Sequence, residues 1–245
     1  MAHRDQTAVP QSTQSDMPEA LQAHPYAWQV ITHLGSASLL LPVMAIVAIA
    51  LWRAGQRAAL RVWLLAFAVA VALTLATKIA FLGWGLGIAT LDFTGISGHT
   101  LLACSVLPLL FGWLLAGERR FSATGAGLGL LAGGLVGASR FALDTHSVSE
   151  VVVAWLFGLA VCSLSLRALE ATAQRPWFAR LSPLLLLLSF NATASTYLPS
   201  HEFEIRIALL LSGRDRHYTR QQSLQPEPGR SQALIGVGHW ATLAQ

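Results

Sequence analysis

Five apolar stretches, each about as long as a bilayer is thick, dominate the chain before residue 170. They cover roughly Ala27–Trp52, Leu60–Leu82, His99–Ala116, Ala123–Ala138 and Val148–Leu166. A transmembrane helix needs about 20 predominantly apolar residues. Only 11% of the 245 residues are charged, against roughly 25% in an ordinary soluble domain. The sequence therefore predicts an all-α, polytopic bundle in a membrane.

A sixth apolar stretch, Leu181–Leu198, begins as a leucine run and then takes up polar residues. It either spans the membrane or lies partly in the interface, so we expect five or six transmembrane helices. Residues 1–26 are rich in Gln, Ser, Thr and Pro and are predicted to form a disordered tail. We expect the membrane domain to cover residues 27–198. Residues 199–245 then form an interfacial segment and a polar tail.

Arginines cluster in three of the loops between the stretches. They are Arg53, Arg57, Arg61, Arg119, Arg120, Arg167, Arg175 and Arg180. The positive-inside rule places these loops in the cytoplasm. We expect the protein to lie in the cell (inner) membrane, with loops 83–98 and 139–147 on the non-cytoplasmic side. A true sixth span would conflict with the rule, because it would place Arg206, Arg214, Arg216 and Arg220 outside.

Two basic residues of the five-span region, Lys78 and Arg140, lie outside the basic loops. Lys78 is the only lysine of the chain and sits near the outer end of the second stretch. It either anchors that helix by reaching to the interface or belongs to a functional site, as ionisable residues within membranes commonly do.

Two polar clusters are predicted at the same end of the bundle. Gly95–His99 leads into the third stretch, and its Ser-Gly turn places backbone N–H groups at a helix N-terminus, which favours anions. Ser139–Glu150 joins the fourth and fifth stretches. Within it, His146 and Glu150 are four residues apart, so on a helix they share one face. A carboxylate that holds one ring nitrogen leaves the other as a base or nucleophile. This set of groups is typical of phosphoryl transfer.

These residues resemble the type 2 phosphatidic acid phosphatase superfamily. Its motifs are a lysine followed by Arg-Pro, then Pro-Ser-Gly-His, then Ser-Arg-x5-His-x3-Asp. The matching positions here are Lys78, Ser97, Gly98, His99, Ser139, Arg140, His146 and Glu150. The resemblance covers about Leu60 to Leu166 and implies a helical core like that of vanadium haloperoxidases.

The resemblance also implies a role for each matched residue. His146 would be the nucleophile that forms a phosphohistidine, His99 the general acid, and Glu150 the acid that orients His146. The implied phosphate-binding groups are Lys78, Ser97, the Gly98 amide and Arg140, with Ser139 as a secondary candidate. No metal or other cofactor is implied. Five of the other histidines, His24, His33, His201, His217 and His239, show no metal-ligand spacing.

Three positions depart from the family motifs. Gly85 stands where the first motif has its arginine, so one phosphate-binding cation is missing. Ile96 replaces the proline before Ser97. Glu150 replaces an aspartate and adds a methylene to a geometry in which about 1 Å matters. Asp144 is an alternative residue to orient His146.

The expected function is hydrolysis of a phosphate monoester or diphosphate on a phospholipid or isoprenoid phosphate at the non-cytoplasmic face. Two alternatives stay open. One is a lipid phosphotransferase on the same scaffold, and the other is a catalytically degenerate protein that binds anionic lipids. Nothing indicates a nucleic-acid partner, and the identity of the lipid and the oligomeric state stay undetermined.

Glycines recur every four residues along the fourth stretch, at Gly125, Gly129, Gly133 and Gly137. Stripes of small residues let transmembrane helices approach closely. We therefore predict that this stretch packs tightly against a neighbouring helix through its glycine face.

Overall fold

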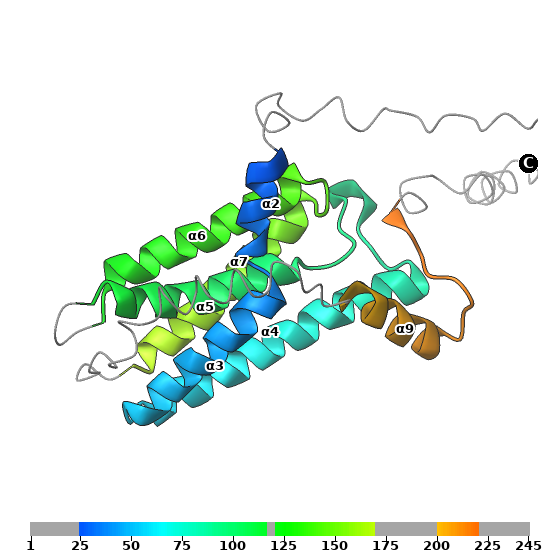
Figure 1. Cartoon of the computed structure of the whole chain (residues 1–245). Helices are drawn as coiled ribbons and strands as arrows, with labels where there is room; N and C mark the ends of the chain where they lie inside the picture. Colours follow the sequence, from blue (N-terminus) through cyan, green and yellow to red (C-terminus); the bar gives the residue numbers. More distant parts are fainter. Residues whose placement is uncertain (1–24, 117–120, 170–199, 221–245) are drawn as a thin grey trace, which may run out of the picture.

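The computed structural model describes residues 25–116, 121–169 and 200–220 (Figure 1). Over these ranges the regular structure is helical. The elements are α2 (Pro25–His33), α3 (Ala37–Arg53), α4 (Arg57–Trp84), the 3₁₀ turn η1 (Ala89–Leu91), α5 (Gly98–Leu114), α6 (Ala123–Ala142), α7 (Val148–Arg167) and α9 (Ser200–Ser212). The described ranges also contain an isolated antiparallel β-bridge between Ile88 and Phe93. The predicted all-helical architecture is confirmed for this part of the chain.

Four helical segments in the described ranges are long and apolar enough to cross a membrane. They are Tyr26–Arg53, α4, α6 and α7. The third predicted stretch forms α5, an apolar helix of 17 residues. The structure is thus consistent with a helical membrane bundle. The proposed sixth span, Leu181–Leu198, and the tail before Pro25 lie outside the described residues.

The first predicted stretch is not one continuous helix. It divides into α2 and α3 at residues 34–36, and the two helices lie at an angle to each other (Figure 1). The Gly35-Ser36 pair at the break is a common cause of sharp helix kinks. Gly35 is also buried so tightly that a Cβ on it would overlap the side chain of Val136. The break directs α2 along α6, toward the end of the bundle that carries loop 143–147.

α5 forms the centre of the bundle and contacts α3, α4, α6 and α7. Every residue from Leu101 to Leu110 is buried. A helix that is apolar on all sides is typically buried in this way. One polar contact crosses the core, where the indole N–H of Trp63 donates to the carbonyl oxygen of Ser105 at 2.9 Å.

The glycine stripe of α6 faces α5, as predicted. A Cβ on Gly129 would overlap the backbone carbonyl of Leu107, and one on Gly125 would overlap that of Phe111. A Cβ on Gly127, which lies off the stripe, would meet nothing within 4 Å. The stripe therefore sets the short separation between the two helices.

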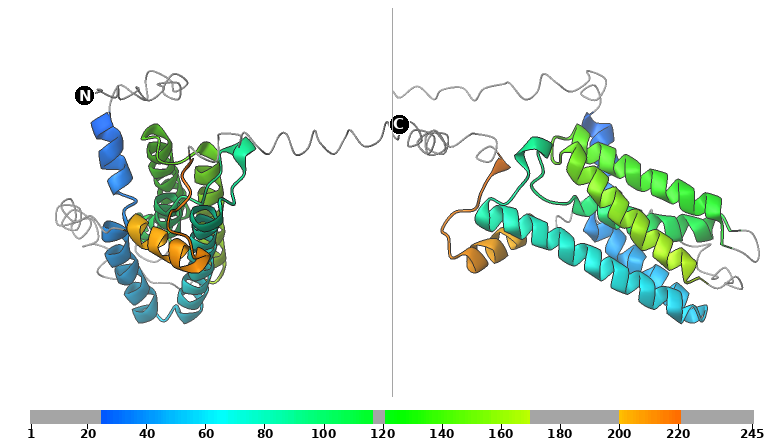
Figure 2. Two further views of the ribbon diagram at one scale, coloured as in Figure 1. Left: turned by 90° about the vertical axis from the view of Figure 1, so that its right-hand side faces the viewer. Right: turned by 180° about the vertical axis from the view of Figure 1, so that it is seen from behind.

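The interfacial segment predicted to begin at residue 199 contains α9. This helix packs on the end of α4 through Ala208, Phe81 and Leu82, opposite the end of the bundle where α7 finishes (Figures 1 and 2). Arg206, Arg214, Arg216 and Arg220 consequently lie at the same end as loops 85–97 and 143–147. The two ends of the bundle therefore differ less in positive charge than a count of basic residues in the interhelical loops alone indicates. The orientation in the membrane stays a prediction.

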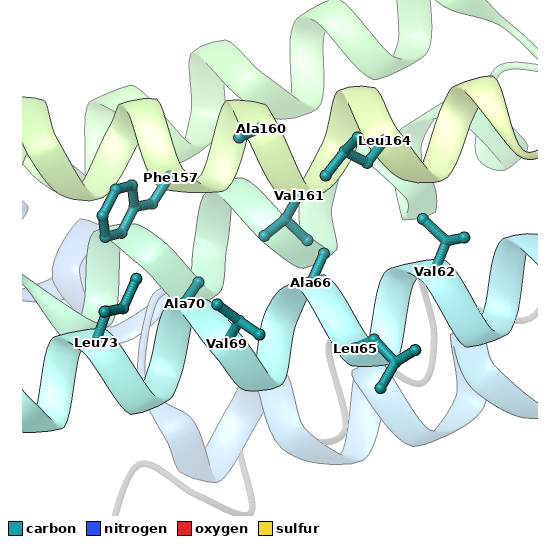
Figure 3. Close-up of a pocket in the computed structure, with 10 residues that line it drawn as sticks. All are labelled: Val62, Leu65, Ala66, Val69, Ala70, Leu73, Phe157, Ala160, Val161 and Leu164. Carbon is teal, nitrogen blue, oxygen red and sulfur yellow. The ribbon is translucent and has the colours of Figure 1, made fainter.

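An apolar groove of about 510 Å³ runs between α4 and α7 (Figure 3). Six residues of α4, from Val62 to Leu73, line one wall, and four residues of α7, from Phe157 to Leu164, line the other. All ten side chains are aliphatic or aromatic.

Candidate active site

The first turn of α7 is closed by a capping box. The backbone N–H of Glu150 donates to the side-chain oxygen of Ser147 at 3.4 Å, and the N–H of Ser147 donates to Glu150 Oε2 at 3.2 Å. The Ser-x-x-Glu sequence at 147–150 is the usual pattern for this motif. The box fixes where α7 begins and places a fully buried carboxylate at its N-terminus.

Glu150 also holds the ring of His146, with 2.6 Å between its Oε2 and Nδ1 of the ring. The expectation that both residues share a helical face is wrong in detail. His146 precedes the N-cap Ser147 and lies outside the helix. The contact forms because the Glu150 side chain turns back over the cap. A carboxylate at Nδ1 keeps the proton on that nitrogen, so Nε2 carries the lone pair.

The second carboxylate oxygen of Glu150 is bound to the loop that follows α4. Oε1 accepts hydrogen bonds from the backbone N–H of Thr94 at 2.6 Å, its hydroxyl at 2.6 Å, and the N–H of Gly95 at 3.1 Å. Buried charges are retained where several donors satisfy them. Glu150 therefore joins the two loops that carry the predicted motifs.

Burial lowers the pKa of His146 below its usual value. The hydrogen bond and the negative charge of Glu150 raise this pKa, and the positive charges of Lys78 and Arg140 lower it further. The net effect is a lower pKa. A ring with a lowered pKa is neutral at neutral pH, which is the protonation state of a nitrogen nucleophile.

α5 begins beside this pair. Ser97 is its N-cap and is fully buried, with its hydroxyl 3.0 Å from that of Thr100. A Cβ on Gly98, the first helical residue, would meet nothing within 4 Å. The space next to the helix N-terminus is thus open on this side, where backbone N–H groups favour an anion.

The His99 ring lies near several cationic or titratable groups, because it interacts electrostatically with Arg140, His146, Lys78 and His33. His146 in turn interacts with Lys78 and Arg140. The two motif histidines, the lysine and the arginine therefore converge at one end of the bundle.

Both cations contact elements that the motifs did not predict. Arg140, in the last turn of α6, donates from Nη1 to the hydroxyl of Thr32 on α2 at 3.1 Å. Lys78 donates from Nζ to both carboxylate oxygens of Glu204 on α9, at 2.9 and 3.1 Å. The expected phosphate-binding lysine thus forms an ion pair in this structure.

The two secondary candidates do not join this group. Asp144 is exposed, in a left-handed conformation with φ of 53°, and Glu150 takes the position at His146 for which Asp144 was the alternative. Ser139 is fully buried and donates to the carbonyl of Val136 at 2.6 Å, which is a contact within its own helix. Over residues 25–116, 121–169 and 200–220, no group of three or more His, Cys, Asp or Glu side chains is placed to hold a metal ion.

Arg220 is the main residue of the site that the sequence motifs missed. Its Nη2 donates to Glu150 Oε2 at 2.7 Å and to the Thr94 hydroxyl at 3.2 Å, and its Nη1 donates to Asp92 at 3.1 Å. Nothing in its local sequence signals this position. Thr94 had a signal, because it directly precedes the Gly95–His99 motif.

Comparison with known proteins gives a relative without an assigned activity. No protein-family model matches the chain, and no solved structure matches it. The chain is 34% identical over 206 residues to a protein of Klebsiella pneumoniae described as an uncharacterized 22.5 kDa protein in the cps region. The match covers 79% of this chain and 95% of that protein. The chain therefore belongs to the same family as the 22.5 kDa protein of the Klebsiella pneumoniae cps region.

Proposed function

We propose that this protein is a membrane phosphatase of the type 2 phosphatidic acid phosphatase superfamily, hydrolysing a lipid phosphate monoester or diphosphate at the non-cytoplasmic face of the cell membrane. The observation that carries the proposal is the buried bond between His146 and Glu150. It lies within electrostatic reach of the cations Lys78 and Arg140. A nucleophile held by an acid among fixed positive charges suits phosphoryl transfer, where positioning and charge stabilisation supply most of the catalysis.

In the first step, Nε2 of His146 attacks the phosphorus in line with the ester or anhydride oxygen. The N–P bond forms as the P–O bond breaks. Glu150 stabilises the positive charge that develops on the ring, because its carboxylate faces the protonated Nδ1. Lys78, Arg140, Ser97 and the backbone amide of Gly98 are the proposed ligands of the remaining phosphate oxygens.

His99 donates a proton to the departing oxygen. Its neighbours Arg140 and Lys78 are positively charged, and a bound phosphate anion offsets that charge, which favours a proton on His99. In the second step His99 accepts a proton from water, the water oxygen attacks phosphorus, and the N–P bond breaks. Inorganic phosphate leaves, and His146 and His99 return to their starting states.

A lipid is the proposed substrate because an apolar groove lies between two helices of membrane-spanning length that both lead to the site. The α4–α7 groove ends at Leu73 and Phe157 (Figure 3). Leu73 precedes Lys78 by five residues, or about 7.5 Å of helix, and Phe157 follows Glu150 by seven, or about 10 Å. A substrate whose phosphate lies among the site residues would therefore have its apolar chain beside the groove.

The direct test measures phosphate release by the purified protein in detergent with a chelator present. The substrates are phosphatidic acid, phosphatidylglycerophosphate, undecaprenyl diphosphate and lipid A phosphates. His146→Ala serves as the blank, and His217→Ala is the matched control. Release by the wild type and by His217→Ala but not by His146→Ala is expected, whereas full activity of His146→Ala would overturn the mechanism.

Two outcomes of the same experiment identify the alternatives. A phosphorylated acceptor lipid with little free phosphate would identify a phosphotransferase. Lipid binding without turnover, retained after loss of both His99 and His146, would identify a protein that only binds anionic lipids.

A further inference from the structure

Residues 200–220, here named the C-terminal strap, are docked onto the end of α4. Ala208 of the strap packs on Phe81 and Leu82. Farther along, the backbone N–H of Tyr218 donates to the carbonyl of Leu82 at 2.9 Å. The Tyr218 ring lies over Gly85, since a Cβ on that glycine would be only 3.0 Å from the ring. The strap is thus fixed at the helix end from which loop 85–97 departs.

This docking brings Arg220 into the centre of the hydrogen-bond network. The guanidinium spans two carboxylates, with Nη1 3.1 Å from Asp92 and Nη2 2.7 Å from Glu150. The Glu150 side chain is 0% exposed, while that of Arg220 is 29% exposed. The planar fork of an arginine holds two acceptors in a fixed relation, which a lysine cannot do.

We propose that Arg220 is a positioning residue for the reaction described above, acting through Glu150 on the nucleophile His146. Oε2 of Glu150 accepts from both Arg220 and His146. The guanidinium therefore constrains the orientation of the carboxylate that holds the ring. This inference rests on the proposed function for its catalytic meaning, and on the three-residue contact for its geometry.

Arg220 also sets how strongly Glu150 acts on the ring. A buried carboxylate next to an imidazole favours the protonated ring, which has no lone pair for attack. A guanidinium on the same oxygen offsets part of that negative charge. Arg220 thereby adds to Lys78, Arg140 and His99, the other basic groups that face this ring, in keeping His146 neutral, and it leaves the hydrogen bond to Nδ1 in place. Asp92 fixes the other side of the guanidinium.

The kinetic test compares Arg220→Ala, Arg220→Lys and the exposed strap control Arg216→Ala as full-length proteins in detergent. For Arg220→Ala we expect kcat to fall about 10- to 100-fold, as for small displacements of a reacting group, with KM within about twofold. The acid limb of the pH profile moves to higher pH, because the pKa of His146 rises. Arg220→Lys returns the limb toward the wild-type position and restores kcat only in part.

Two kinetic results would overturn the inference. A rise in KM at unchanged kcat in Arg220→Ala would make Arg220 a ligand of the substrate phosphate. Equal kinetics in Arg220→Ala and Arg216→Ala would remove Arg220 from the site.

A second measurement does not require turnover. In protein labelled with ¹⁵N at histidine, the His146 ring signals are assigned by their loss in His146→Ala. Their titration midpoint should move to higher pH in Arg220→Ala but not in Arg216→Ala. An unchanged midpoint in Arg220→Ala refutes the inference. If the wild type released no phosphate, or if His146→Ala released as much as the wild type, only the proposed function would be refuted.

Discussion

Nδ1 of His146 lies 2.6 Å from Oε2 of Glu150, and the same oxygen accepts the backbone N–H of Ser147 that closes the first turn of α7. One carboxylate therefore caps a buried helix and holds the candidate nucleophile. The histidine lies in a loop, but its ring is oriented by the rigid end of α7. Sites supported by rigid elements hold their geometry more closely than sites built on loops alone.

The first prediction separates these two roles of Glu150. Glu150→Gln keeps the size of the side chain and removes its charge, so the ring loses its preferred tautomer and the stabilisation of its developing charge. We expect kcat for phosphate release to fall by roughly 100-fold or more. Stability should also fall by about 1–3 kcal/mol, because both carboxylate oxygens accept from donors and the amide NH2 of Gln must face one set of them. Steady-state kinetics and thermal unfolding in detergent measure the two effects.

Ser147→Ala is the matched control, because it removes the hydroxyl of the capping box and leaves the bond between His146 and Glu150. Its stability should fall by about 1 kcal/mol as well, while kcat stays within severalfold of the wild type. Equal losses of kcat in the two variants would mean that Glu150 acts only as a helix cap.

The second prediction concerns pH. Burial lowers the pKa of His146, and the nucleophile must be neutral, so the acid limb of kcat/KM should lie below the ordinary histidine value of about 6.5. Glu150→Gln removes a charge that raises this pKa, so in that variant the limb should move to still lower pH. A profile of residual activity between pH 4 and 8 checks the direction, and a shift of the limb to higher pH would contradict it.

The bundle was predictable where the signal is local in sequence. Hydropathy alone placed α4, α5, α6 and α7, and the four-residue spacing of glycines indicated the tight face of α6. The break at Gly35 was missed because hydropathy does not register a kink within an apolar run. The capping box at Ser147 and Glu150 was missed as well, although the sequence contains its Ser-x-x-Glu pattern. Because this box starts the helix at Val148, His146 lies outside it.

The site was predictable only where its residues lie in motifs. Lys78 pairs with Glu204 across 126 positions, and Arg220 reaches Glu150 across 70. No periodicity or spacing connects residues so far apart, since their meeting depends on how α9 docks on α4. The strap sequence has mixed charges, and nothing in it indicated that Glu204 and Arg220 would contact residues of the site.

The third prediction follows from the ion pair of Lys78. A substrate phosphate has to compete with Glu204 for the lysine Nζ. Glu204→Gln should therefore lower KM for the lipid phosphate by roughly fivefold, since a partly exposed pair contributes up to about 1 kcal/mol. Lys78→Met should raise KM in the same assay. The nearby Glu202→Gln is the control, because Glu202 is exposed, and a KM for Glu204→Gln equal to that of the control would argue against competition.

The fourth prediction tests the contact between α5 and α6, which sets the distance from His99 on one helix to Arg140 on the other. Gly129→Ala places a methyl group against the backbone of Leu107, so the helices must separate or shift. We expect a loss of about 1–3 kcal/mol in unfolding free energy and a lower kcat although the change is far from the site. Gly127→Ala, whose methyl group enters open space, should raise stability by about 0.5–1 kcal/mol through helix propensity and leave kcat unchanged. Thermal unfolding in detergent and phosphate release distinguish the pair, and equal stability of the two variants would show that the stripe does not set the helix separation.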